Sequence, residues 1–394
     1  MSLNTASALA RADNRLDAAA WYAIIAGMSG SFVGIGLARF AYTPLLPSLI
    51  EAHWFTADAA VTLGAANFVG YLIGALLGRP LAAVMPSRHL LRLLMVAATA
   101  AFFACAYPLS ASWYFVWRFL SGLSGGAIMV LVATSILPHI PPARRGFASG
   151  MIFLGLGLGI AASGTVVPLL LRLGLWESWM GLGALSLVLS AISWFGWPAA
   201  ATPTAASAGA PQGTTGLRAL YVAYALNALG LVPGMLLLVD FIARGLDQGA
   251  DVGAQYWVLY GAAAIVGPLL CGSAGDRIGF RRAYRLALLL QAVAVAILAA
   301  TSNPAWVAVS TVILGIFTPG VVPLLLGSIH EVLPGHLEAQ RAAWSVATTA
   351  FALFQALAGY GYSTLFAFSG GNYALIFACG SAALAVAFLA ALKR

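Results

Sequence analysis

An arginine inside an apolar run is the residue of this sequence whose chemistry is hardest to explain as packing. Arg39 lies about two thirds of the way along the apolar stretch 21–50 and closely follows Gly34 and Gly36. A bilayer is spanned by about 17–25 apolar residues, and a charge within it costs roughly 2.5–3.5 kcal/mol or more. We therefore predict that Arg39 binds a substrate. The alternative is a structural charge that pairs with a carbonyl or extends toward the lipid headgroups.

A second arginine, Arg118, lies in the apolar run 113–137. The run with Arg39 and the run with Arg118 are predicted to cross the membrane in opposite directions. Arg39 lies toward the end of its run, and Arg118 lies one to two helical turns after the start of its run, which is on the same side of the membrane. At about 1.5 Å per helical residue, the two arginines are predicted at comparable depth. Two arginines in one cavity repel each other unless an anion or a carboxylate lies between them. The alternative is that Arg118 ties the spans together through backbone carbonyls.

Polar side chains in the second half of the sequence are predicted to complete this cavity. Asp240 is the carboxylate clearly inside a predicted span there, so it is a candidate proton carrier, or else an acid or gate residue at the outer interface. His330 is interpreted as a loop residue at the end of a span. The predicted substrate-binding residues are Arg39, Arg118, Tyr224, Asn227, Gln255, Tyr260 and Gln355.

The composition places these residues in a membrane protein. The 394 residues are 62% hydrophobic and 8% charged, with a mean hydropathy of +0.94, which excludes a soluble enzyme. The net charge of +8 lies mostly in short loops, so it indicates membrane topology rather than a nucleic-acid partner. We find no metal-ligand cluster, phosphate-cradling loop or catalytic triad, and we expect no cofactor. The three cysteines are far apart and predict no disulfide framework.

The lengths of the apolar runs and the polar loops between them predict an all-α integral membrane protein with about twelve transmembrane helices. A small-residue linker over 198–216 separates two groups of six, which gives a first domain over 1–197 and a second over 217–394. The spans are predicted at roughly 21–49, 59–78, 90–110, 113–137, 146–171, 176–197, 217–243, 252–274, 284–302, 304–329, 342–366 and 372–391.

The basic residues predict the orientation of these spans. Of the 19 Lys and Arg, Arg39 and Arg118 lie inside spans, Arg172 and Arg244 fall on one side, and the remaining fifteen fall on the other. Basic loops stay on the cytoplasmic side of a membrane, so both termini and the linker are predicted there. We expect a multi-pass protein of the bacterial inner membrane that functions as a monomer.

The loop after the eighth span has the residue types of a gate. Glycines such as Gly272 allow close helix approach, Asp276 can cap a helix start or pair with an arginine, and Gly279 permits a turn. This stretch resembles the G-x-x-x-D-R-x-G-R-R loop of the major facilitator superfamily. The predicted gating residues are Gly272, Asp276, Arg277, Gly279 and Arg281. The alternative is a basic loop that only sets topology. The first-half counterpart, 74–92, lacks the aspartate.

Other stretches extend this resemblance over essentially the whole chain. Arg118 and Gly122 match the superfamily's R-x-x-x-G motif, whose arginine faces the central cavity. The glycine-rich fifth span departs from the superfamily's antiporter motif, because it lacks the Gly-Pro pair. The stretch 34–47 looks most like the YbfB/YjiJ-type bacterial branch. The resemblance implies two six-helix bundles around a midplane cavity, with alternating access by rocking of the bundles.

Three functions follow from these residues. The first is a secondary transporter for a small organic anion such as a carboxylate, driven by protons, because the first-half spans hold two arginines and no obvious carboxylate. The second is proton-coupled efflux of amphipathic drugs or metabolites, which would depend on Asp240. The third is a membrane receptor or scaffold without transport. The expected partners are a small-molecule substrate, protons and the lipid bilayer.

Overall fold

The computed structural model describes residues 16–55, 57–199 and 214–392. Twelve of its helices are long and apolar enough to cross a membrane, and the described residues contain no strand. The all-α fold and the expectation of about twelve spans are therefore confirmed. The first helices are α2 (Ala18–Ser31), the π-helix η1 (Phe32–Leu37), α3 (Ala38–Phe40), α4 (Tyr42–Glu51), α5 (Ala57–Val84), α6 (Ser87–Cys105), α7 (Ala111–Ile136), the short η2 (Leu137–His139) and η3 (Pro142–Arg144), α8 (Arg145–Leu171) and α9 (Leu175–Ser193).

The remaining helices follow the linker. They are α10 (Thr214–Asp240), η4 (Phe241–Gly245), α11 (Ala250–Ile278), α12 (Phe280–Ala300), α13 (Pro304–Val332), α14 (Leu337–Phe368) and α15 (Tyr373–Leu392). Most predicted span limits lie within a few residues of these bounds. The largest difference is in α5, which runs on through Arg79 and Pro80 to Val84.

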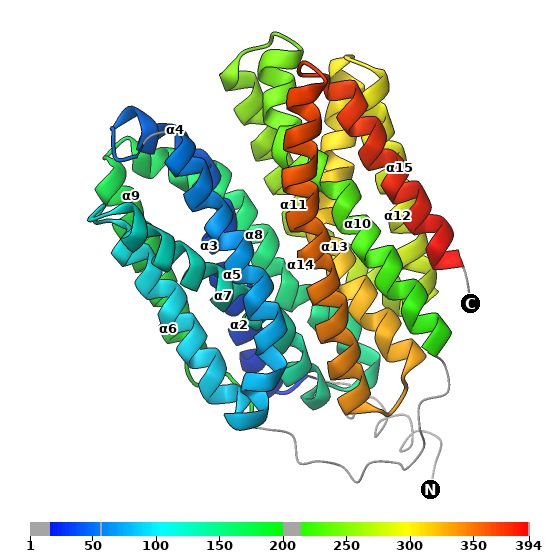
Figure 1. Ribbon diagram of the computed structural model, residues 1–394. Helices are drawn as coiled ribbons and strands as arrows, with labels where there is room; N and C mark the ends of the chain where they lie inside the picture. The colour runs from blue at the N-terminus through cyan, green and yellow to red at the C-terminus, as the bar shows by residue number, and fades with distance from the viewer. Residues whose placement is uncertain (1–15, 56, 200–213, 393–394) are drawn as a thin grey trace, which may run out of the picture.

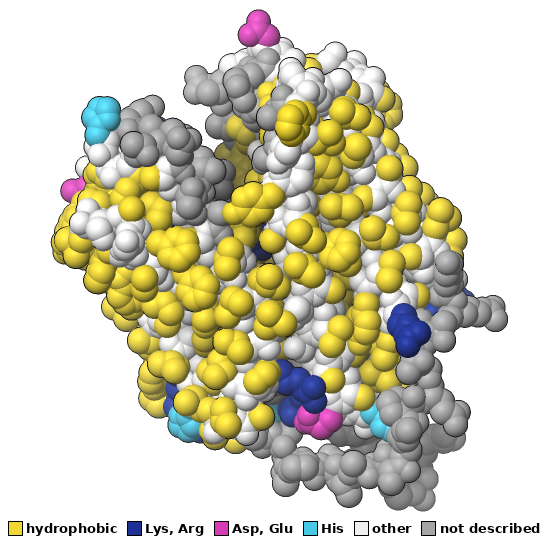
Figure 2. Space-filling view, in the orientation of Figure 1, with side chains coloured by type: hydrophobic (Ala, Val, Ile, Leu, Met, Phe, Trp, Pro, Cys, Tyr) yellow, Lys and Arg dark blue, Asp and Glu magenta, His cyan; other side chains and the backbone are white. Residues whose placement is uncertain are grey.

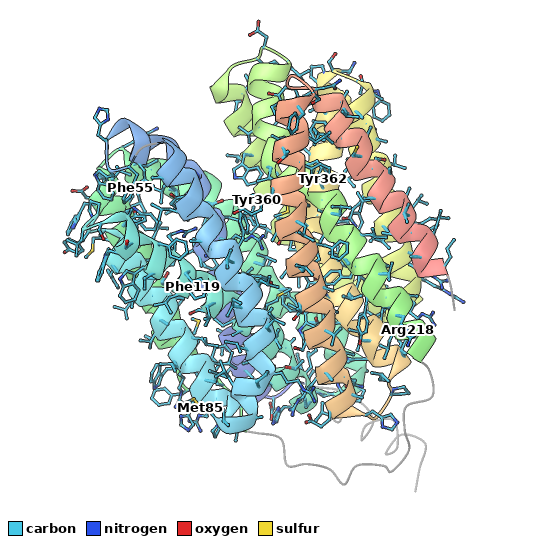
Figure 3. The ribbon with its side chains drawn as sticks, in the orientation of Figure 1. Phe55, Met85, Phe119, Arg218, Tyr360 and Tyr362 are labelled. Atoms are coloured by element: carbon cyan, nitrogen blue, oxygen red, sulfur yellow. The ribbon has the colours of Figure 1, made fainter. Side chains whose placement is uncertain are left out.

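The helices form two groups, which we call the first half (α2 to α9) and the second half (α10 to α15). Figure 1 shows that the halves approach each other at one end and diverge at the other. We call the closed end the linker end, because α9 ends there at Ser193 and α10 begins there at Thr214. The opposite end is the far end. In Figure 3, Met85 and Arg218 lie toward the linker end, whereas Phe55 lies at the far end.

A seam of glycines joins the two halves along α8 and α11. A Cβ at Gly150 would lie 2.6 Å from the carbonyl oxygen of Pro268, and a Cβ at Gly157 would overlap the carbonyl oxygen of Ala264. Only glycine lets two helix backbones approach so closely. The glycine-rich span therefore packs across the boundary between the halves, and not only within its own half.

The outer surface of the molecule suits a lipid environment. Figure 2 shows hydrophobic side chains over the flank of the molecule and charged side chains gathered toward its two ends. Large apolar residues such as Leu187, Phe195, Val222 and Leu389 are exposed, which is the arrangement of a protein that faces hydrocarbon. The same view shows a hollow between the two halves at the far end.

Candidate functional site

A local change of helix type precedes Arg39. The first span runs as an α-helix to Ser31, continues as the π-helix η1 over Phe32–Leu37, and returns to α-helix at Ala38. A π-helix has an extra residue in its turn, so the side chains that follow point in a different direction around the helix axis. Such turns are frequent at functional sites. Gly36 lies inside this turn, and a Cβ there would be 2.7 Å from the Cα of Gly159 in α8. The two glycines thus allow the widened turn to fit against α8.

Arg39 lies among aromatic rings. Its guanidinium carbon is 4.6 Å from the ring centroid of Phe68, 5.3 Å from that of Tyr71 and 5.9 Å from that of Phe40. The side chain is half-buried. In the described part of the chain, no hydrogen-bond acceptor or carboxylate contacts the guanidinium of Arg39. The rings attract the cation, but they leave all five of its N–H donors for another partner.

Arg118 lies beside Arg39 in a different role. It is only 3% exposed, and its Nη1 donates to the carbonyl oxygen of Ala38 at 3.0 Å. Its guanidinium carbon lies 4.3 Å from the ring centroid of Tyr42. Because Ala38 directly precedes Arg39, this bond places Arg118 at a depth comparable to that of Arg39. The hydrogen bond to Ala38 also matches the alternative in which Arg118 ties the spans together, because it joins α7 to α3.

Asn67 is a site residue that the sequence reasoning missed. Its Nδ2 donates to the carbonyl oxygen of Ala38 at 3.3 Å and to Ser121 Oγ at 3.4 Å, so it joins the first, second and fourth spans at the residue before Arg39. Asn67 is 3% exposed. It is also the one amide side chain in the stretch 57–84, and a polar residue inside an apolar span is a signal that could have identified it.

Two polar residues predicted to face the cavity from the second half are instead enclosed within that half. Asn227 is fully buried, and its Nδ2 donates to Gln291 Oε1 of α12 at 3.1 Å. Tyr260 is also buried, and its hydroxyl group forms a hydrogen bond with Thr318 of α13. Trp257 stacks on the Tyr260 ring at 5.0 Å between centroids. In this conformation both side chains hold helices of the second half together.

Two further predicted residues lie between α10 and α14. Tyr224 packs its ring 4.5 Å from that of Phe351, and its side chain is buried. Gln355 is 6% exposed, and its Nε2 lies 3.7 Å from Met235 Sδ. A bond to a thioether sulfur is weak, so Gln355 retains capacity to hydrogen-bond a ligand.

The last two predicted residues lie toward the far end of the second half. Gln255 is exposed, one turn into α11. Asp240 is the last residue of α10, and its side chain lies outside the part of the chain that the structure describes. Its predicted role as a proton carrier therefore stays a prediction.

The predicted gating residues lie where the two halves meet at the linker end. Asp276 of α11 accepts a hydrogen bond from the backbone N–H of Phe147 at 3.0 Å, in the first turn of α8. A Cβ at Gly146 would overlap this carboxylate, and a Cβ at Gly272 would overlap the carbonyl oxygen of Gly146. A carboxylate at a helix N-terminus satisfies a free N–H and complements the helix dipole. Asp276 therefore caps a helix of the opposite half.

The gating stretch is helical rather than a loop, which corrects the sequence-based interpretation. Asp276 and Arg277 lie in the last turn of α11, and Gly279 alone, at a φ of 88°, separates α11 from α12. Only glycine adopts this backbone angle readily, so a single residue suffices for the turn. Arg277 is exposed, and the backbone N–H of Arg281 donates to Glu331 Oε2 at 3.2 Å.

Two contacts that α14 makes with helices of the first half also close the linker end. Trp344 of α14 is fully buried, and its Nε1 donates to the carbonyl oxygen of Met129 in α7 at 3.0 Å. Arg79 of α5 lies 4.0 Å from Glu338 of α14, and both side chains are largely exposed. An exposed ion pair contributes little to stability, so the buried indole is the stronger of these two contacts.

We expect Asp276→Asn to favour opening of the linker end. Asparagine keeps an acceptor oxygen but loses the charge that complements the helix dipole, which contributes about 0.3–1 kcal/mol, so the ratio of open to closed molecules should rise by roughly twofold to fivefold. The measurement is the alkylation rate of a cysteine introduced as Ser149→Cys, which lines the closed boundary, with the three native cysteines replaced. Arg277→Gln is the matched control, because Arg277 is an exposed neighbour. Equal alkylation rates in the Asp276→Asn and unaltered backgrounds would contradict the capping role.

Comparisons with known proteins match this architecture. The profile of a family described as "uncharacterised MFS-type transporter YbfB" matches residues 31–392. The 4-hydroxybenzoate transporter PcaK of Pseudomonas aeruginosa is 33% identical over 171 residues, which are 42% of this chain and 37% of that protein. The chain thus matches little more than a third of the length of this relative.

Solved structures show the same fold at low sequence identity. The human organic anion transporter MFSD10 (TETRAN) superposes with a TM-score of 0.75 and 17% identity, covering 94% of this chain and 99% of that one. The major facilitator superfamily transporter FucP, in the outward conformation, superposes with a TM-score of 0.72 and 13% identity, covering 94% and 97%.

Proposed function

Because this chain belongs to the family of YbfB-type transporters of the major facilitator superfamily, we propose that it carries a small organic anion, a carboxylate, across the membrane by alternating access. One observation carries the substrate class. Arg39 is half-buried between aromatic rings, and no acceptor in the described part of the chain contacts its guanidinium. A guanidinium that lacks an acceptor within a span is suited to bind a ligand that carries a negative charge.

The charge distribution of the first half supports an anion. No Asp or Glu occurs between Asp58 and Glu177, so the interior of the second to fifth spans contains no acid. Arg39 of the first span and Arg118 of the fourth therefore leave the first half electropositive around the boundary. An anion would gain from both charges, whereas a lipophilic cation would be repelled.

The rings around Arg39 favour an aromatic carboxylate as the first substrate to test. Phe68 and Tyr71 offer aromatic faces beside the guanidinium, so a ligand could place its carboxylate on Arg39 and its ring against theirs. The partial sequence match to a 4-hydroxybenzoate transporter supports the same chemical class. In this scheme Arg39 is the anion-binding residue, and Gln255 and Gln355 are the amides that orient the rest of the ligand.

Arg118 and Asn67 then act as positioning residues for Arg39. Both donate to the carbonyl oxygen of Ala38, the residue directly before Arg39. These bonds hold the backbone of the widened turn against α5 and α7, so the guanidinium starts from a fixed backbone position. Asn227, Tyr224 and Tyr260 hold the second half together in the state described, and we assign them a ligand contact only in another state of the cycle.

The remaining parts of the proposal concern energy coupling and orientation. We propose that each half moves as a six-helix unit, and that protons drive transport with Asp240 as the carrier. With both termini cytoplasmic, the linker end faces the cytoplasm and the hollow at the far end faces outward. The monomer is the proposed functional unit, in a bacterial inner membrane.

The first test is a thermal-shift screen of the purified protein in detergent. Benzoate and 4-hydroxybenzoate are compared with a lipophilic cation and with a neutral sugar. A ligand that binds the folded state stabilises it by mass action, by about 2.7 kcal/mol at a concentration one hundred times its Kd. We expect saturable stabilisation by the carboxylates, and we expect it to be lost in Arg39→Ala. Stabilisation by the lipophilic cation alone would favour efflux of amphipathic compounds and contradict the proposal.

A further inference from the structure

A cavity lies between the halves at the linker end, and Arg39 is not among its lining residues. Its volume is about 210 Å³. Arg145 of α8 contributes to it from the first half, and His330 of α13 and Arg341 of α14 contribute from the second. Its other lining residues are Thr134, Leu137, Pro138, Gly335, Leu337 and Gln340, so no carboxylate lines it among the described residues.

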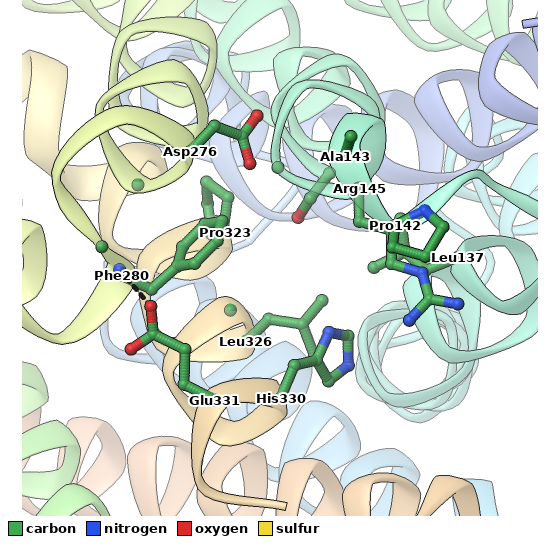
Figure 4. A pocket seen from close by; sticks show the side chains of 15 residues that line it. Leu137, Pro142, Ala143, Arg145, Asp276, Phe280, Pro323, Leu326, His330 and Glu331 are labelled. Carbon is green, nitrogen blue, oxygen red and sulfur yellow. Dashed lines mark hydrogen bonds between the residues drawn. The ribbon is translucent and has the colours of Figure 1, made fainter. Parts of the chain in front are cut away.

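Arg145 and His330 form the core of this cavity. Arg145 donates through Nε to the carbonyl oxygen of Ile140 at 3.2 Å, and its two terminal nitrogens have no acceptor in the described part of the chain. His330 is half-buried in the last turn of α13, so the interpretation of this residue as part of a loop was wrong. Both residues also line a neighbouring cavity of about 460 Å³, and Figure 4 shows Arg145 and His330 on adjoining walls of it.

The acids near this cavity have other partners. Arg341 pairs through Nη1 with Glu338 at 2.8 Å, but Glu338 is largely exposed and does not line the cavity. Glu331 lines the neighbouring cavity and accepts from the backbone N–H of Phe280 at 2.7 Å, as Figure 4 shows. Asp276 lines it too and caps α8. The small cavity therefore keeps one uncompensated positive charge, that of Arg145 in the first half, and the ion-paired Arg341 of the second half lies on the same lining.

We propose that this cavity binds a small oxyanion, a carboxylate or a phosphate, from the solution at the linker end, and that the bound anion holds the two halves together there. Arg145 and Arg341 come from opposite halves and line the same cavity, and Arg145 has no carboxylate partner there. An oxyanion between them adds charge-assisted hydrogen bonds, which His330 and the Gln340 amide extend.

A bound anion would act on the conformational equilibrium. The site is complete only while the linker end is closed, because opening separates Arg145 from His330 and Arg341. A ligand that binds one conformation shifts the population toward it. The anion therefore favours the state that is open at the far end, and it slows opening at the linker end. This site does not depend on Arg39 or on the identity of the transported substrate.

The test uses inorganic phosphate and benzoate as separate probes, with chloride added to keep the ionic strength constant. The readouts are the thermal shift of the purified protein and the alkylation rate of Ser149→Cys in a background without the native cysteines. At about ten times its Kd, an anion that binds only the closed state should slow alkylation roughly tenfold. Slowing by either oxyanion, but not by chloride, supports the proposal and identifies which oxyanion the cavity accepts.

Variants locate the effect in the cavity. Arg145→Gln, His330→Gln and Arg341→Gln should each remove most of the anion effect on alkylation. Among the described residues Arg341 donates to the exposed Glu338 alone, so its variant keeps the test valid if Arg145→Gln does not fold. Arg218→Gln is the matched control, because Arg218 is exposed and lies on the outer side of the second half (Figure 3).

Two results would overturn this inference. One is an alkylation rate and a melting temperature of the unaltered carrier that do not respond to either oxyanion. The other is an anion effect that survives Arg145→Gln and Arg341→Gln but is lost in Arg39→Gln, which would place binding at the central site. If Arg39 proves not to bind a substrate, but the oxyanion still slows alkylation in Arg39→Gln, the proposed function is contradicted and this inference is supported.

Discussion

Arg39→Lys is expected to lower the initial rate of carboxylate uptake into proteoliposomes by roughly two orders of magnitude. Loss of one partner from a buried, hydrogen-bonded charge pair costs about 2–5 kcal/mol of binding. Lysine keeps the positive charge but lacks the planar fork that binds a carboxylate through two parallel hydrogen bonds. It also loses the flat face that packs against Phe68 and Tyr71. Charge alone therefore does not restore this site.

The measurement is uptake of radiolabelled 4-hydroxybenzoate, with KM and maximal rate determined separately. The larger change is expected in KM, because Arg39 contacts the ligand before the carrier changes conformation. Arg218→Lys is the matched control, since it makes the same substitution at an exposed position. Uptake by Arg39→Lys at the rate of the unaltered carrier would exclude the proposed anion site.

Gly157→Ala is expected to lower transport strongly by a different route, through the seam between the halves. A Cβ at Gly157 would overlap the carbonyl oxygen of Ala264 and lie 3.0 Å from the Cα of Ile265. These are backbone atoms of α11, so they cannot move aside as a side chain can. Overpacking of this kind costs about 1–3 kcal/mol or more, and here it must separate α8 from α11. We expect uptake to fall at least roughly tenfold, because the closed packing of the seam is lost.

Gly164→Ala provides the control on the same helix. A Cβ at Gly164 would lie 3.5 Å from Trp257 Cδ1, which is an ordinary van der Waals contact. This variant should transport normally, although it makes the same chemical change in the same seam. The amount of monodisperse protein from size-exclusion chromatography distinguishes loss of transport from loss of folding. Equal transport by the two variants would show that the close approach at Gly157 is dispensable.

The features that a bilayer imposes on each segment could be predicted without the structure. The number of spans follows from the length and hydropathy of each apolar run, and twelve such helices are present. Arg39 was identified from its cost inside an apolar run, and Asp276 and Gly279 from the chemistry of caps and turns. These inferences need no knowledge of neighbouring helices, because each depends on one segment and its solvent.

The tertiary structure decided which side chains meet. Arg118 donates to the Ala38 carbonyl, Asp276 caps a helix of the opposite half, and Asn227 turns toward α12. Each of these contacts depends on the rotation of one helix about its axis relative to another. Every face of a membrane helix is apolar, so hydropathy leaves that rotation undetermined. In this protein close glycine contacts, both within each half and across the seam between the halves, accompany the observed helix rotations, and these contacts exist only once the helices have packed.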